Sequence, residues 1–363
     1  MTEVFMKRFF IFFTLFFFSG MTISHSSGEE SDSSSGRQTF FGLPVLTYST
    51  DTGVGAGVAA VKTYNPDRER ISYVQMAFLY TQKKQIINSW KWDHYFPENI
   101  GRIIFKCDYS KFPTYFFGMG NNTSNSDPEK YTPEYFITRF YYERGLKKQF
   151  RIRTQVYFYS QSLLKSEPGG QIHLSNVPWS RGRRDAGTGI AFLWDSRDNI
   201  IATNDGLLMQ VEYEGSLYQN KGHAYNLLTL DLRKFFNPFP DIVLGSMVRV
   251  KDCRGNVPFY SLAMLGGQDL LRGYEYDRFR DRSAFLFQQD IRYPIWGVLG
   301  GAVFIATGCV DDKVSKLFSG TFHTAYGAGL RFIINKEDNL IVRFDYAVGS
   351  DSTGYYITFG EAF

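Results

Sequence analysis

The chain has 363 residues, of which 18% are aromatic and 21% are charged, so it is too rich in large apolar side chains to be intrinsically disordered. Its 40 Lys and Arg against 36 Asp and Glu leave a formal net charge of +4, too small for a nucleic-acid partner held by charge. Beyond the first residues there is no apolar run of about 18 residues, which excludes a bundle of transmembrane helices. Cys107, Cys253 and Cys309 lie far apart, without the spacing of a metal site or a disulfide framework.

Residues 1–26 have the pattern of a secretory signal peptide. Lys7 and Arg8 precede the apolar run Phe9–Phe18, and small and polar residues follow it. As a helix this run would rise only about 15 Å, roughly half of a hydrocarbon core, which disfavours a membrane anchor. We expect cleavage near Ser26, followed by a polar tether over residues 27–42.

From residue 43 to residue 363 the side chains alternate between apolar and polar, which is the period of a β-strand. The last run shows this best, and its apolar face carries Tyr355, Ile357, Phe359 and Phe363. We interpret this run as a C-terminal barrel signal, to be recognised by an assembly machinery. In a soluble sandwich the apolar face would point to a core, and in a membrane barrel it would point to lipid. Alternation alone leaves both possibilities open.

Sixteen such runs occur, and an even number is expected of a bacterial outer-membrane barrel. If both ends of the series face the periplasm, the longest connections, residues 112–134, 161–185 and 253–281, all fall on the outer side. This asymmetry favours an all-β, antiparallel transmembrane barrel over residues 43–363, surrounded by outer-membrane lipid. The predicted strands are residues 43–50, 54–64, 71–82, 85–95, 101–111, 135–145, 149–160, 186–196, 206–218, 222–234, 241–252, 282–293, 298–310, 321–334, 338–348 and 353–363.

The connection before the twelfth predicted strand is too charged for lipid, and an ordinary exposed loop would explain its composition. Its residues Leu265-Gly266-Gly267 and Leu271-Arg272-Gly273-Tyr274, however, resemble the loop of the BamA and TamA superfamily, the bacterial surface antigens. In that family the loop folds back into the lumen, and its Arg-Gly-aromatic tip rests against carboxylates of the inner wall. The resemblance implies the same position for Arg272, Gly273 and Tyr274, because a buried guanidinium needs a carboxylate partner.

The resemblance continues into the following strands. Residues 287–294, Phe-Gln-Gln-Asp-Ile-Arg-Tyr-Pro, are similar to the family's twelfth strand, which makes Asp290 the expected inner-wall partner of Arg272. Residues 304–308 resemble the family's Phe-x-Asp-x-Gly, but Ala306 stands where a second carboxylate is expected. We therefore expect Asp290 to be the single partner. The inner turn at 195–199 and the strands from residue 326 to 363 also resemble the family.

Relatives that insert barrels carry periplasmic POTRA domains, and residues 27–42 leave no room for one. The resemblance thus implies a member without POTRA domains, with a separate periplasmic partner or none. The expected role is assisting the insertion or translocation of proteins, with unfolded barrels as clients. The first strand is short and contains Pro44, which fits a weak closing seam and an ordinary strand start equally well.

No constellation of catalytic residues is found. The four histidines after the signal lie far apart, and adjacent Asp93 and His94 point to opposite faces of a strand. Metal-spaced His pairs, a nucleophile elbow and a phosphate-cradling loop are absent from the sequence, so we expect no enzyme, no metal and no cofactor. A passive pore or a structural surface protein is the alternative, because sixteen strands can enclose an aqueous channel.

Overall fold

The computed structural model describes residues 40–49, 53–64, 72–82, 84–97, 100–124, 127–147, 149–174, 182–199, 202–219, 224–335 and 340–363. The predicted signal peptide and most of the tether lie outside these residues. The long strands are β1 (Phe40–Ser49), β2 (Gly53–Tyr64), β3 (Ser72–Thr81), β4 (Ile86–Tyr95), β5 (Gly101–Lys111), β7 (Glu129–Gly145), β8 (Phe150–Lys165), β9 (Gly182–Asp195), β10 (Gly206–Gln219), β11 (Tyr225–Phe239), β12 (Ile242–Gly255), β15 (Ser283–Trp296), β16 (Leu299–Asp311), β17 (His323–Asn335), β18 (Leu340–Val348) and β19 (Thr353–Phe359). The short elements are β6 (Thr114–Phe116), β13 (Ala263–Leu265), β14 (Phe279–Asp281), the helix α1 (Gln171–Leu174) and the 3-10 helices η2 (Phe259–Ser261) and η3 (Val314–Ser319).

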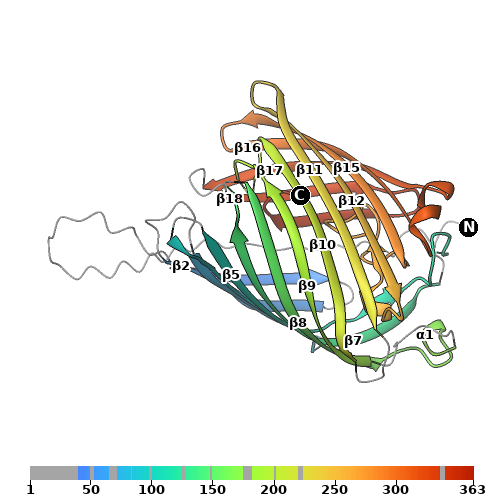
Figure 1. Ribbon diagram of the computed structural model, residues 1–363. Helices are drawn as coiled ribbons and strands as arrows, with labels where there is room; N and C mark the ends of the chain where they lie inside the picture. The colour runs from blue at the N-terminus through green and yellow to red at the C-terminus, as the bar shows by residue number, and fades with distance from the viewer. Residues whose placement is uncertain are drawn as a thin grey trace, which may run out of the picture.

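Each long strand pairs antiparallel with the next along the chain, so one continuous sheet runs from β1 to β19. The sheet has 17 strands when β6 is counted, and β6 is a three-residue strand that pairs only with β7. The sheet curls into a barrel (Figure 1), which confirms the predicted 16-stranded antiparallel barrel. Within the described residues, no backbone pairing joins β1 to β19. None of the helices in the described part of the chain has the length and hydropathy needed to span a bilayer.

The two faces of the strands are inverted relative to a soluble protein. On β11 the outward residues Leu228, Leu230 and Leu232 are exposed, whereas inward Asp231 is only 7% exposed and pairs with Arg233 at 2.8 Å. Apolar side chains outside and ion pairs inside are expected where lipid replaces water as the outer solvent. The sequence alternation therefore corresponds to a lipid-facing belt.

The two ends of the barrel differ. One end, here the turn end, carries tight connections such as residues 240–241 between β11 and β12 and residues 297–298 between β15 and β16. The opposite end, here the loop end, carries the long connections and the helices α1 and η3 (Figure 1). We name its four long connections loop A (residues 112–128), loop B (166–181), loop C (256–282) and loop D (312–322).

Several strand boundaries differ from the sequence prediction by three residues or more, and three of them have a clear physical reason. β1 begins at Phe40, ahead of residue 43, because Phe40 and Phe41 still pair with Lys62 and Val61 of β2. β7 begins at Glu129 rather than 135, because the sheet continues past the lipid belt into the packed loop end. β19 ends at Phe359 rather than 363, because Gly360 has a φ of +73° and turns the chain away from the sheet.

The inverted faces predict a depth-dependent cost for charge on β11. Leu230→Arg, at the middle of the strand, should lower the free energy of unfolding by about 2–4 kcal/mol, because it places a cation in hydrocarbon. Asn226→Arg is the matched control on the same outward face near the loop end, where about 0–1 kcal/mol is expected. The measurement is denaturant-induced unfolding from lipid vesicles. Equal costs at the two positions would contradict the assigned membrane depth.

Candidate functional site

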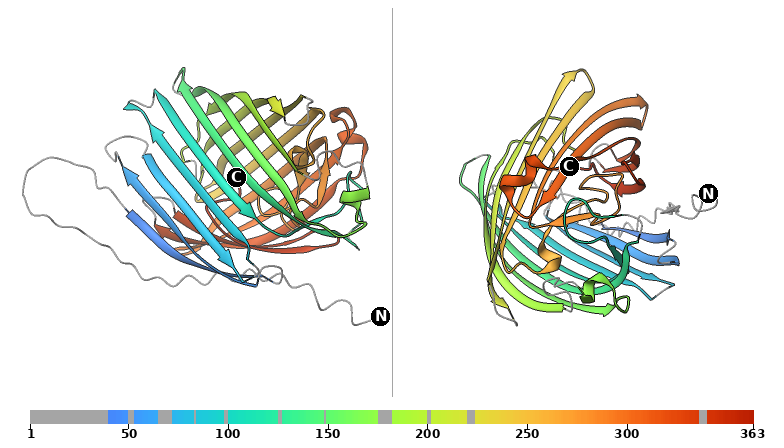
Figure 2. Two further views of the ribbon diagram at one scale, coloured as in Figure 1. Left: turned by 90° about the horizontal axis from the view of Figure 1, so that it is seen from below. Right: turned by 90° about the vertical axis from the view of Figure 1, so that its right-hand side faces the viewer.

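Loop C leaves β12 and returns to β15 by way of η2 and the two-stranded β13–β14 hairpin. Seen from the loop end (Figure 2, right), it lies within the outline of the curled sheet. Gly266 and Gly267 have φ of +119° and +92°, and Gly267 N donates to Tyr274 O at 3.0 Å. These two glycines therefore close the base of a narrow tip that carries Arg272 and Gly273.

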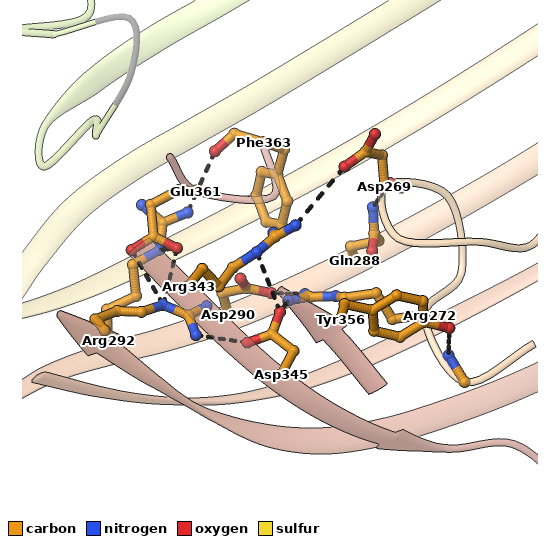
Figure 3. A network of polar contacts seen from close by, with 12 residues as sticks. Asp269, Arg272, Gln288, Asp290, Arg292, Arg343, Asp345, Tyr356, Glu361 and Phe363 are labelled. Carbon is orange, nitrogen blue, oxygen red and sulfur yellow. Dashed lines mark hydrogen bonds and ion pairs between the residues drawn. The ribbon is translucent and has the colours of Figure 1, made fainter. Parts of the chain in front are cut away.

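Arg272 is fully buried at this tip and contacts the inner face of the sheet. Its Nη2 donates to Asp290 Oδ1 at 2.6 Å, and its Nη1 donates to Asp345 Oδ2 at 2.7 Å (Figure 3). Its guanidinium also lies over the ring of Phe304, 3.5 Å from the ring centre. Burial opposes the charged form of Arg272, but Asp290 and Asp345 outweigh that effect and raise the pKa of the guanidinium above its ordinary value.

The expectation that Asp290 is the single partner is therefore wrong, because Asp345 of β18 supplies a second carboxylate. Ala306, at the position where that carboxylate was expected on β16, does face inward and is 1% exposed. Asp345 can occupy the space because its partner across the β17–β18 ladder is Gly329, where a Cβ would collide with the Asp345 carboxylate and the backbone of Phe344. The second carboxylate therefore comes from β18 and not from β16, where the resemblance placed it.

Gly273 and Tyr274 fix the tip against the loop end of β17 to β19. Gly273 has a φ of +104°, and a Cβ there would lie 3.0 to 3.1 Å from Gly349 N and Ala325 Cβ, so only glycine fits without displacement. Its N donates to the Tyr356 hydroxyl at 2.9 Å. The Tyr274 hydroxyl donates to Thr324 O at 3.1 Å, and its ring is 1% exposed.

Charged residues that the sequence analysis did not single out extend the site towards the turn end. Arg331 Nη1 donates to the free oxygen of Asp345 at 2.5 Å, and its Nε donates to Glu361 at 3.1 Å. Arg343 Nε lies 3.4 Å from Asp345 and its Nη2 lies 3.7 Å from Asp269 of the loop itself. The sequence could have identified two of these residues as inward-facing, because Arg343 and Asp345 alternate with apolar residues along β18 and so share one face.

The predicted C-terminal apolar face is partly corrected. Tyr355 lies beside Tyr346 with ring centres 4.8 Å apart, and Tyr346 is 39% exposed on the outward face. The side chains of Ile357 and Phe359 lie outside the described residues. Phe363 points inward and is only 7% exposed, because the chain leaves the sheet at Gly360.

Contacts between loops hold the described part of the loop end together. Asn121 of loop A accepts from Val310 N at 3.0 Å and donates to Thr321 O of loop D at 2.7 Å. Arg278 of loop C donates to Thr123 of loop A through both Nη atoms, at 2.6 and 2.7 Å. The rings of Phe116 in loop A and Phe259 in loop C meet edge to face, with centres 5.0 Å apart. Loop C is thereby covered by its neighbours.

Asp93 and His94, the titratable pair noted in the sequence, make contacts within the barrel wall. Asp93 is buried and binds Arg102 at 2.6 Å, whereas neighbouring His94 contacts Tyr64 at 3.1 Å. No cluster of three metal-ligating side chains occurs among the residues that the structure describes. What the described residues form is a structural contact between loop C and the inner wall, centred on Arg272.

The two-carboxylate contact predicts coupling. Arg272→Met and Asp345→Asn should each lower the free energy of unfolding by about 3–5 kcal/mol, because each leaves a buried charge without its partner. The double variant should lose less than the sum, as should Arg272→Met with Asp290→Asn. Asp231→Asn, which breaks a separate inward pair with Arg233, is the control and should add to Arg272→Met within about 0.5 kcal/mol. Denaturant unfolding in micelles measures all of these, and simple additivity at Asp345 would remove it from the contact.

Comparison with known proteins identifies the family. The model of the Omp85 superfamily domain matches residues 72–363. BamA from Haemophilus ducreyi lacking POTRA domains 1–3 has a similar structure, with a TM-score of 0.59 at 11% identity, over 89% of this chain and 69% of that one. CdiB from Acinetobacter baumannii gives a TM-score of 0.54 at 14% identity, over 88% of this chain and 59% of that one. No curated protein matches the sequence. The structural likenesses show the fold and the domain match spans most of the chain, so this protein belongs to the Omp85 superfamily of bacterial outer-membrane barrels.

Proposed function

We propose that this barrel assists the insertion or translocation of proteins at the bacterial outer membrane, with loop C acting as a plug of the lumen. Proteins of this family are transporters or assembly factors and not enzymes, so the expected absence of catalysis follows from the family. The clients we propose are unfolded outer-membrane barrels, with lipid as the surrounding medium and a separate periplasmic protein as a further partner.

The observation that carries the proposal is the burial of Arg272 between two wall carboxylates inside an Omp85 barrel. A buried ion pair stabilises little by comparison with apolar packing, but it specifies one position, because an unpaired charge would be strongly penalised there. A loop held in the lumen narrows any channel there, which argues against a wide passive pore. The contacts at the loop end support the same reading, since loop A is bonded both to loop C and to loop D.

The proposed mechanism uses the edges of the sheet. β1 and β19 are the first and last strands, and an open edge can accept a client strand through main-chain hydrogen bonds. Pro44 lies within β1 and cannot donate to a ladder, which fits a weak seam. A plugged lumen would then keep solutes from leaking while the seam opens.

Single-channel conductance in a planar bilayer tests the plug. The intact protein should give a small, flickering current, and deletion of residues 266–278 should give a large and steady one. Deletion of η3 is the matched control, because Phe318 of η3 packs on outward Phe285 with ring centres 5.0 Å apart and not in the lumen. A large, steady current from the intact protein would instead establish a passive pore.

Cross-linking tests the seam. Cysteine pairs placed between β1 and β19 in a background without native cysteines should, when oxidised, stop the protein from accelerating the folding of an unfolded barrel client into vesicles. Reduction should restore the acceleration, which separates locking from misfolding. Undiminished acceleration with the seam locked would contradict strand addition at this edge.

A further inference from the structure

Residues 360–363, here the terminal strap, leave β19 and lie on the inner side of the wall. The turn depends on Gly360, whose φ is +73° and whose N donates to Ile341 O at 2.8 Å. Beyond it, Glu361 and Phe363 point towards Arg292 of β15 (Figure 3). Since β15 lies four ladders away from β19, the strap runs along the turn end past the strands between them.

The strap is held by an aromatic contact with Phe235 and by hydrogen bonding to Arg292. Phe363 packs against Phe235 of β11, with ring centres 5.9 Å apart, and Phe235 is fully buried. Arg292 lies near both rings, and its Nη2 donates to Phe363 O at 3.2 Å while its Nη1 donates to Thr203 O at 3.1 Å. The strap thus connects the last strand to the β9–β10 turn and to β11.

The same strap touches the network that holds the tip of loop C. Glu361 binds Arg331 at 3.1 Å and lies 3.6 Å from Arg292. Arg331 binds one oxygen of Asp345, and Arg272 of loop C binds the other. A continuous series of charge contacts therefore joins loop C, which enters from the loop end, to the strap at the turn end.

The strap completes the charge balance of this series, because the wall carries one more arginine than carboxylates, whereas the two ions of loop C cancel each other. The wall contributes three arginines and two carboxylates, and loop C contributes Arg272 and Asp269. Asp269 is 59% exposed and therefore screened by water, so the buried wall and tip carry an excess of positive charge without the strap. Glu361, whose side chain is 4% exposed, reduces this excess by one buried negative charge. The members are Arg272, Arg292, Arg331, Arg343, Asp269, Asp290, Asp345 and Glu361.

We propose that the terminal strap and the tip of loop C are energetically coupled, so that withdrawal of the strap at the turn end loosens the loop in the lumen. When Glu361 is removed, the positive charge of the three wall arginines, Arg292, Arg331 and Arg343, loses a compensating carboxylate. Holding Arg272 as a fourth cation in the same network then becomes less favourable. The reverse also holds by linkage: release of Arg272 changes the hold on the strap by the same factor. The coupling rests on the folded barrel alone and holds whether or not the barrel inserts clients.

Native Cys253 reports on loop C without any change in the loop. It faces inward on β12, is 1% exposed, and its Sγ lies 3.6 Å from Ser261 O of loop C. With Cys107→Ala and Cys309→Ser removing the other thiols, the rate at which a water-soluble maleimide modifies Cys253 measures lifting of loop C. Glu361→Gln should raise that rate about tenfold, as should Arg272→Met, and the double variant should be no faster than Arg272→Met alone.

Asp241→Asn is the matched control, because it makes the same change of charge at an exposed turn of the turn end, outside the network. It should leave the Cys253 rate as in the parent. A folded Glu361→Gln protein with the parent rate overturns the coupling.

The reciprocal measurement does not need the Glu361 variant to fold. A single thiol placed in the strap by Ala362→Cys, with the three native cysteines replaced, reports on the strap itself. Adding Arg272→Met should raise its modification rate by a factor similar to that seen at Cys253. An unchanged rate in the folded Arg272→Met protein also overturns the coupling.

Discussion

The structure depends on one ionic contact, the guanidinium of Arg272 held between the carboxylates of Asp290 and Asp345. A charge at 0% exposure tolerates no other arrangement, because each broken contact would leave a buried ion without a partner. Around it the backbone is adapted for close approach: Gly273 allows the tip to touch β17 and β18, and Gly329 leaves space for the Asp345 side chain. The contact thereby determines where a long loop lies relative to four strands.

The barrel wall makes this contact possible by separating two solvents. Outward leucines such as those of β11 face lipid, so the charged residues of alternate positions are confined to the inner face, where they satisfy one another. The inner face of β15 to β18 carries enough arginine to need carboxylates from outside the wall. The terminal strap supplies Glu361 from the turn end, whereas loop C enters from the loop end with Arg272 and Asp269, whose charges cancel.

This arrangement gives loop C a defined position at the inner wall. Loop A is bonded to loops C and D at the loop end, and Phe363 packs on Phe235 and holds the strap at the turn end. Such an arrangement suits a barrel that works through its seam better than one that conducts through its lumen. It also makes the two ends responsive to each other, since a buried network with a fixed balance of charge cannot lose one member without affecting the rest.

The sequence by itself determined the sixteen strands and their inward and outward faces, because period-two alternation is a local property, and its resemblance to a known family assigned Arg272 to the loop tip. It placed Asp290 on the inner wall by the parity of its strand. Only the tertiary structure identified the further members of the network, Asp345, Arg331 and Glu361, because the curling of the sheet decides which inward residues of different strands meet. The alternation placed Phe363 on the lipid face, which is wrong. Side chains alternate only while a strand continues, and the φ of Gly360 ends β19 before Phe363. Alternation specifies the face of a residue, whereas only the tertiary arrangement of strands, loop and strap specifies its partner.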